Sequence, residues 1–202
     1  MKLRSALWLV TLIAGLVVGG FIILHSARQP QSGTISTTGS ARIGGPFQLV
    51  NQDGHPVNES LLRGHWSLVF FGYTYCPDVC PTTLQALAQA QDQLGPNGRN
   101  VQVVFVSVDP QRDTPAQLKT YLSAQGLPHG VIGLTGTPQQ VAAVAHAYAI
   151  YYARQGEGVG YTVNHSTVTY LMNPQGQLAQ PIPYGIAPAQ IADQIRAAMR
   201  GA

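Results

Sequence analysis

The hydrophobic positions of this chain fall into one long block near the N-terminus and several short blocks after it. Residues 6–24 form the long block, with 19 consecutive positions that carry no charged side chain. Because a helix needs about 20 apolar residues to cross a bilayer, the block predicts a transmembrane anchor. Lys2 and Arg4 precede it. The positive-inside rule then predicts that residues 1–5 stay in the cytoplasm and that the rest of the chain is translocated.

A cleavable signal peptide is the alternative interpretation of this N-terminal block. Such a peptide has an apolar stretch of about 7 to 15 residues and a small-x-small cleavage site behind it. The sequence His25-Ser26-Ala27 fits that site poorly, so we expect an uncleaved anchor. No Arg- and Ser-rich transit sequence comes first, which favours a bacterial inner membrane with the translocated part in the periplasm.

The short apolar blocks follow a polar stretch and predict one folded domain. Residues 25–40 are rich in Gly, Ser, Thr, Pro and Gln, which is typical of a flexible linker. Residues 41–202 suit a single domain with its own core. Buried strands are predicted at 66–73, 101–108 and 167–172, with a weaker one at 131–134. Helices are predicted between and after them at 81–94, 115–125, 138–148 and 188–199.

The alternation of strands and helices indicates an α/β fold. Turn residues at 51–54 and 173–176 predict an early and a late hairpin. The net charge of +3 arises from Lys2, Arg4 and Arg28, because eight basic side chains balance eight acidic ones from residue 41 onward. This balance offers no basic surface for a nucleic-acid partner.

The only two cysteines of the chain, Cys76 and Cys80, occur together in the motif YCPDVCP. All four predicted helices begin with a residue followed by proline, which is favoured at the first helical position. By analogy with Thr114, Thr137 and Ala187, Cys80 is expected to be a helix N-cap. A residue before proline is disfavoured in the α conformation, so both cysteines are expected outside the helix, at either end of a turn.

Two sulfurs in that position lie near free backbone N–H groups and the positive end of a helix dipole, which favours thiolates. The motif therefore predicts a site for two anions. Thiolates are soft ligands that select Cu(I), Zn or iron–sulfur chemistry, and a trigonal copper site adds a histidine. Of the six histidines, His165 stands out because it follows an exposed Gly-rich loop and directly precedes a predicted strand. A loop histidine there can reach a thiol at a helix start.

Three segments together resemble the SCO/SenC family of copper-binding assembly factors for cytochrome oxidase. They read GYTYCPDVCPTTL, SVDPQRDTPAQLKTYL and VNHSTVTYLMNPQG, in this order behind one predicted anchor. The resemblance covers the chain from Pro46 to the final helix. It implies a thioredoxin-like fold, with a central mixed sheet flanked by helices, and copper held by Cys76, Cys80 and His165.

The resemblance also implies a function and a partner. The protein would deliver copper to the dinuclear copper centre of cytochrome c oxidase, or act on the thiols of that centre. Its partner would be the copper-bearing oxidase subunit or an intermediary copper carrier. We expect a monomeric metallochaperone whose chemistry is ligand exchange rather than enzymatic turnover.

One position departs from the family pattern. In the family an aspartate usually precedes the histidine, whereas Asn164 precedes His165 here. A carboxylate beside the metal adds negative charge and favours the higher oxidation state. We therefore expect this protein to hold Cu(II) less tightly than relatives with the aspartate.

Two alternatives to a copper site stay open from the sequence. A thiol-disulfide oxidoreductase or peroxide-reducing enzyme of the same fold would use the Cys76/Cys80 pair for redox chemistry. Three intervening residues, where such oxidoreductases usually have two, disfavour the first, and Tyr73 stands where a peroxiredoxin would have threonine. A structural disulfide would close a loop too short to stabilise the fold much.

The remaining candidates have structural explanations. Met172 fits the apolar pattern of its strand and is expected in the core. The polar residues after the second strand are predicted to form loop-fixing ion pairs or a docking surface: Asp109, Arg112 and Asp113. Asp78 fits a solvated turn. The aromatic residues near the motifs could shield a metal from water: Tyr73, Tyr75 and Tyr161.

Overall fold

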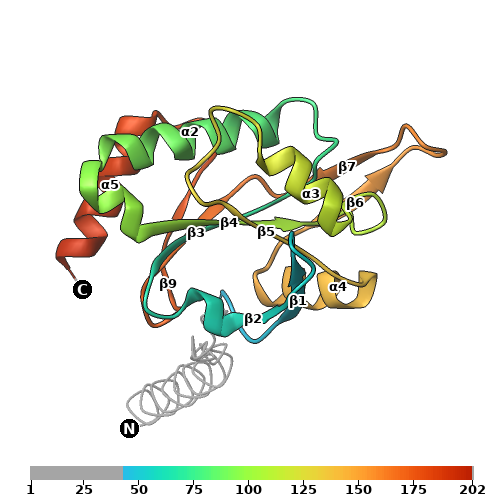
Figure 1. Ribbon diagram of the computed structural model, residues 1–202, viewed down its shortest axis with the longest axis horizontal. Helices are drawn as coiled ribbons and strands as arrows, with labels where there is room; N and C mark the ends of the chain where they lie inside the picture. Colours follow the sequence, from blue (N-terminus) through green and yellow to red (C-terminus); the bar gives the residue numbers. More distant parts are fainter. Residues whose placement is uncertain (1–42, 202) are drawn as a thin grey trace, which may run out of the picture. The chain divides into compact units, whose positions relative to one another are not determined.

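The computed structural model describes residues 43–201 and is shown in Figure 1. The predicted cytoplasmic segment, anchor and linker (residues 1–5, 6–24 and 25–40) lie outside these described residues. Between residues 43 and 201, no helix has both the length and the apolar character needed to cross a membrane.

In the described part of the chain seven strands form one mixed sheet, in the order β2-β1-β5-β4-β3-β8-β9. Their bounds are β1 Gln48–Asn51, β2 Pro56–Asn58, β3 Trp66–Gly72, β4 Val101–Ser107, β5 Ile132–Thr135, β8 Thr169–Met172 and β9 Leu178–Ile182. β3, β4 and β5 run parallel, whereas β1 and β8 are antiparallel to their neighbours β5 and β3. The predicted α/β class and both predicted hairpins, β1–β2 and β8–β9, are confirmed.

The centre of the sheet is apolar on both faces. In β3 and β4 every residue except Trp66 and Gln102 is buried. Parallel strands covered by helices on both faces carry continuous apolar runs of this kind, which is why the sequence located these two strands to within a residue. Met172 at the end of β8 is fully buried, as expected for a core residue.

Within residues 43–201, four helices and two short 3₁₀ turns cover the sheet. Their bounds are η1 Glu59–Leu62, α2 Val79–Gln93, η2 Gly95–Asn100, α3 Pro115–Leu122, α4 Pro138–Ala147 and α5 Pro188–Arg200. Successive right-handed crossovers from β3 to β4 and from β4 to β5 place α2 and α3 on one face. α5 packs beside α2, and α4 lies on the opposite face next to β1 (Figure 1).

A second, two-stranded sheet projects from the domain. It is the antiparallel hairpin of β6 Tyr152–Gln155 and β7 Thr162–His165, which extends to the right in Figure 1. The sequence predicted an exposed loop here, and the hairpin was missed. The strands are short and mostly polar, so their composition resembles that of a loop.

Candidate metal centre

Cys76 lies in a turn directly after the central strand β3. Its backbone N–H donates to the carbonyl of Tyr73 at 3.2 Å, and its side chain is half-buried. The preceding turn residue Thr74 is anchored through its N–H and hydroxyl, which donate to the Asp113 carboxylate at 3.0 and 2.7 Å. The same carboxylate accepts from the Ser107 hydroxyl at 2.6 Å. The end of β4 therefore fixes the turn that carries the first cysteine.

Cys80 lies inside helix α2, and the prediction that it is the N-cap was wrong. Asp78 is the N-cap, and the first helical backbone bond runs from the Thr82 N–H to the Asp78 carbonyl. Pro81 is thus the third helical residue rather than the first. The first N–H groups of a helix have no partner within it, so a proline at this position removes no hydrogen bond. Thr114, Thr137 and Ala187 are N-caps as predicted.

The helix start holds the Cys76 sulfur, as the motif predicted. The backbone N–H of Cys80 donates to the Cys76 Sγ at 3.4 Å. A hydrogen bond from the Cys80 thiol, aided by backbone N–H groups, lowers the pKa of Cys76 to about 5. The same shared hydrogen bond and burial raise the pKa of Cys80. In the metal-free site these opposite pKa shifts favour a thiolate at Cys76 and a thiol at Cys80, rather than the expected pair of anions.

Cys80 is enclosed by the scaffold. Its side chain is fully buried, and a Cβ placed on Gly72 would lie 2.7 Å from its sulfur and 2.8 Å from the Phe105 ring. Gly72 is the last residue of β3, so only the absence of a side chain lets helix α2 bring the thiol this close to the strand. The sequence shows a glycine at the end of a strand, but the contact that requires it is tertiary.

His165 is the last residue of β7, opposite Tyr152 of β6. The expectation of a loop histidine was wrong, because β-pairing extends through the position. Its Nδ1 lies 2.9 Å from the Ser166 carbonyl, a contact that places the ring proton on Nδ1 and leaves Nε2 free to bind a metal. The Tyr73 ring meets the imidazole edge-on, with centroids 5.9 Å apart at 90°.

The three predicted ligands converge in space. Nε2 of His165 lies 3.5 Å from Sγ of Cys80, and the three ligand atoms lie within 4.8 Å of one another. A metal bonded at roughly 2.0 to 2.3 Å spans up to about 4.6 Å between two ligands, so small rotations suffice to close the site. Two sulfurs and one imidazole suit a soft or borderline ion. Within residues 43–201, no other trio of His, Cys, Asp or Glu side chains gathers this closely.

The other polar and aromatic residues named in the sequence analysis either surround the three candidate ligands or lie apart from them. Arg112 pairs with Asp109 at 2.5 Å, which confirms the loop-fixing ion pair, whereas Asp113 anchors Thr74 instead. Tyr73 is buried against His165, and Tyr75 is more than half exposed. The remaining described histidines are exposed: His55, His65, His129 and His146.

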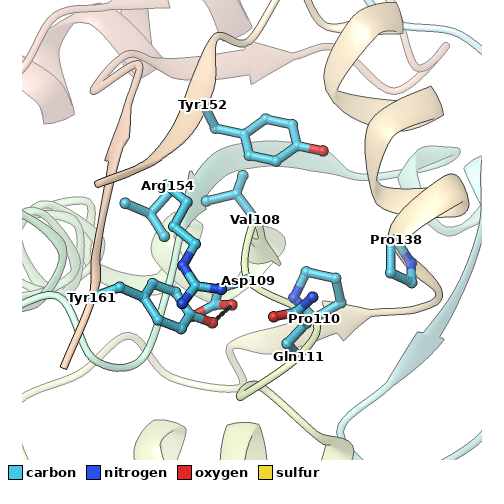
Figure 2. A pocket seen from close by; sticks show the side chains of 9 residues that line it. Val108, Asp109, Pro110, Gln111, Pro138, Tyr152, Arg154 and Tyr161 are labelled. Carbon is cyan, nitrogen blue, oxygen red and sulfur yellow. Dashed lines mark hydrogen bonds between the residues drawn. The ribbon is translucent and has the colours of Figure 1, made fainter. Parts of the chain in front are cut away.

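A small cavity of about 160 Å³ opens beside the hairpin (Figure 2). It is lined by Asp109, Tyr152, Arg154 and Tyr161 among others, and by none of the three candidate ligands. One of its lining residues links the hairpin to the main domain: the hydroxyl of Tyr161, directly before β7, donates a hydrogen bond to the Asp109 carboxylate.

Comparison with known proteins gives consistent matches. The family model SCO1/SenC matches residues 35–200. A protein named SCO1 homolog 1, mitochondrial, from Arabidopsis thaliana is 45% identical over 69% of this chain, a match that spans 42% of that relative's length. A SCO2-like protein of Rickettsia prowazekii is 34% identical over 88% of this chain and 90% of its own length.

A solved structure shares the architecture. The crystal structure of Arabidopsis thaliana ScoI with copper bound has a TM-score of 0.74 and 38% identity, and the match covers 79% of this chain and 99% of that one. The mixed central sheet with flanking helices therefore matches the thioredoxin-like fold that the sequence motifs implied.

Proposed function

Because this chain belongs to the SCO1/SenC family, we propose that it is a copper carrier that binds one copper ion through Cys76, Cys80 and His165. It delivers this copper to the dinuclear copper centre of cytochrome c oxidase, directly or through an intermediary carrier, or prepares the thiols of that centre. The observation that carries the proposal is the 3.5 Å approach of His165 Nε2 to Cys80 Sγ, from positions 85 residues apart in the chain.

The donor set suits a carrier. Two sulfurs and an imidazole match the soft and borderline preferences of copper. Three protein ligands leave a coordination position open to an incoming ligand, such as a thiolate of the acceptor, so that copper can leave by ligand exchange. Cys76 is half-buried and Cys80 is fully buried, so exchange is expected to begin at the Cys76 side.

Copper uptake is coupled to proton release. Metal binding requires deprotonated thiols, and the metal-free pair already holds one thiolate on Cys76 because its pKa is lowered to about 5. The proton on Cys80 leaves when the metal binds. We therefore expect the release of about one proton per copper ion near neutral pH.

The proposal also assigns a membrane anchor and a linker to the N-terminal segments. The charge-free residues 6–24 anchor the protein in a bacterial inner membrane, with Lys2 and Arg4 in the cytoplasm and the copper domain in the periplasm. The linker at residues 25–40 lets the domain reach roughly 20 Å across the membrane surface, near an integral-membrane oxidase. An alkaline phosphatase fusion after residue 40 tests the orientation: activity supports a periplasmic domain, and inactivity contradicts it.

A thiol-disulfide oxidoreductase is the second candidate. The observation in its favour is the thiolate of Cys76 beside the thiol of Cys80, both unbridged in the structure. That arrangement suits attack on a disulfide followed by closure of the pair. His165 has no required part in this chemistry, so the histidine separates the two functions.

Copper titration of the full-length protein in detergent decides between them. Cys76→Ser and Cys80→Ser are expected to abolish stoichiometric binding, and His165→Ala to lower Cu(II) affinity by roughly 100-fold and change the visible spectrum. His129→Ala, at an exposed histidine beside Asp92, is the control and should bind as wild type does. Unchanged stoichiometry and spectrum in His165→Ala, with fast turnover of a protein disulfide, would establish the oxidoreductase instead.

A further inference from the structure

One guanidinium group, that of Arg112, contacts both the cysteine segment (residues 73–80) and the histidine hairpin (β6, β7 and the residues between them). Its carbon lies 3.6 Å from the centre of the Tyr161 ring and 4.7 Å from the centre of the Tyr75 ring. Tyr75 immediately precedes Cys76, and Tyr161 immediately precedes β7, which ends at His165. One side chain from the β4–α3 loop therefore contacts both segments that supply the candidate ligands.

Hydrogen bonds fix the orientation of this guanidinium. Its Nη1 donates to the Tyr161 carbonyl at 2.9 Å, and its Nε donates to Asp109 Oδ2 at 2.5 Å. The other oxygen of Asp109 accepts from the Tyr161 hydroxyl at 2.6 Å, the bond drawn in Figure 2. Arg112 and Asp109 expose only 15% and 4% of their side chains, so water competes little for these contacts.

The hairpin depends on such side-chain contacts for its position. In residues 43–201 the β6–β7 sheet is separate from the seven-stranded sheet, so no strand ladder joins the two. At its base the Ser166 N–H donates to the Tyr151 carbonyl at 2.9 Å and the Tyr151 N–H donates to the Ser166 hydroxyl at 3.0 Å, and both bonds hold the hairpin to itself rather than to the cysteine segment. Arg112 and its partners Asp109 and Tyr161 add a hydrogen-bonded link to the ring contact between Tyr73 and His165.

We propose that Arg112 is a positioning residue for copper binding: it clamps the hairpin so that His165 stays beside the two cysteines and engages the metal. This inference rests on the proposed function for its metal. A planar guanidinium donates in two directions while it stacks on aromatic rings, and a lysine ammonium has no such plane. The clamp therefore requires arginine and not only a positive charge.

Arg154 provides a matched control on the same ring. Its guanidinium carbon lies 3.9 Å from the centre of Tyr161, against which it lies in Figure 2. Its side chain is exposed, and its Nη2 donates to the Gly158 carbonyl within the hairpin at 3.1 Å. Arg154 therefore resembles Arg112 in its charge and in its contact with Tyr161. However, its two partners, Tyr161 and Gly158, both belong to the hairpin.

The test compares Arg112→Lys with Arg154→Lys in the full-length protein. Arg112→Lys keeps a positive charge opposite Asp109 and so removes the geometry without leaving a buried charge unpaired. We expect it to lower Cu(II) affinity about tenfold and to weaken the imidazole nitrogen coupling in the EPR spectrum. Arg154→Lys should stay within about twofold of wild type, as surface substitutions usually do.

A double-mutant cycle separates positioning from a general structural role. In the His165→Ala background, Arg112→Lys should cause no further loss of affinity, because the ligand that it positions is already gone. An equal loss in that background would overturn the proposal, and so would wild-type affinity and EPR coupling in Arg112→Lys alone.

A metal-free readout keeps this inference distinct from the proposed function. NOEs between the rings of His165 and Tyr73 should weaken in Arg112→Lys and persist in Arg154→Lys. If wild type binds no copper, the proposed function fails, while these NOEs still decide whether Arg112 positions the histidine; unchanged NOEs overturn the clamp. If Arg112→Lys does not fold, Tyr161→Phe, which removes only the hydroxyl bond to Asp109, should weaken the same NOEs to a lesser degree, and unchanged NOEs there contradict the clamp.

Discussion

The two segments that supply the candidate ligands are built in different ways. The cysteine segment continues from the central strand β3 into helix α2, and its turn is anchored by a fully buried carboxylate, Asp113. The histidine segment ends a mostly polar two-stranded hairpin that, among the residues described by the structure, shares no strand pairing with the main sheet. The first segment continues the central strand of the core, and the second contacts the core through side chains, among them the buried Tyr161 and Val163.

This difference has a consequence for a metal carrier. The energy that places the two sulfurs comes from folding of the whole domain, so it is present before any metal arrives. The imidazole is placed by side-chain contacts of the hairpin, including those of Arg112, Tyr161 and Tyr73, and we expect them to be more easily changed than the strand pairing of the main sheet. A copper-binding protein built in this way has two sulfur ligands placed in advance, and its affinity for copper can change with the position of the third ligand.

The largest expected difference lies between the two cysteines themselves. In the reduced, metal-free protein, iodoacetamide should modify Cys76 at least roughly 100-fold faster than the buried Cys80 at pH 7, because the thiolate is the nucleophile. The pKa of Cys76 is lowered to about 5 from an ordinary 9.0, so its rate should be pH-independent near neutrality and fall as the pH drops through about 5. Peptide mass spectrometry measures both rates. Preferential modification of Cys80, or a midpoint near pH 9 in the rate of Cys76, contradicts the assignment of the thiolate to Cys76.

The next prediction breaks the anchor of the cysteine segment. Asp113→Ala leaves the N–H and hydroxyl of Thr74 and the hydroxyl of Ser107 without their acceptor. Each buried donor without a partner costs about 1 to 3 kcal/mol, and we expect a total loss of roughly 2 to 4 kcal/mol in the free energy of unfolding. Denaturant unfolding measures it. The control is Asp193→Ala, at an exposed carboxylate paired with Arg196, where the loss should be below about 0.5 kcal/mol.

Two glycines test whether the core and the hairpin tolerate the same change. A Cβ on Gly72 would meet the Cys80 sulfur at 2.7 Å, whereas a Cβ on Gly160 in the hairpin meets nothing within 4 Å. Gly72→Ala should therefore cost about 1 to 3 kcal/mol by overpacking and weaken copper binding by displacing the sulfur. Gly160→Ala should change stability by less than about 0.5 kcal/mol. Equal effects of the two substitutions on thermal unfolding would show that the two regions are not built differently.

The same contrast explains how much of the molecule could be predicted from its sequence. The core strands were located because burial on both faces leaves continuous apolar runs, as in β3 and β4. The three candidate ligands were predicted because the two cysteines occur in one motif and because the segments around them and around His165 resemble the SCO/SenC family. The hairpin was missed because its strands, YARQ and TVNH, are short, mostly polar and separated by glycines.

Tertiary contacts account for the other differences. The role of Asp113 depends on a turn 39 residues away, and that of Gly72 on a helix that crosses its strand. Neither contact leaves a local pattern. Cys80 was placed at the N-cap by analogy with three helices that have proline at their first position, but α2 begins two residues before its proline. Proline restricts where a helix can start only to within its first turn.

The smallest expected effect concerns Asn164, the residue directly before His165. Adjacent side chains of a strand point to opposite faces, and Asn164 is exposed whereas His165 is partly buried. A carboxylate at this position is therefore directed away from the metal and screened by water. Asn164→Asp should still raise Cu(II) affinity more than Cu(I) affinity, but by no more than about fivefold, since an exposed charge pair is worth up to roughly 1 kcal/mol.

Competition titrations with chelators for each oxidation state measure this difference. Thr162→Asp is the matched control, because it adds the same charge to an exposed position of β7 that faces the same side as Asn164 but lies further from the ligand. The effect of Asn164→Asp should exceed that of Thr162→Asp and shrink as salt is raised. An equal gain for Cu(I) and Cu(II) would show that the residue before His165 acts on the hairpin rather than on the charge of the metal site.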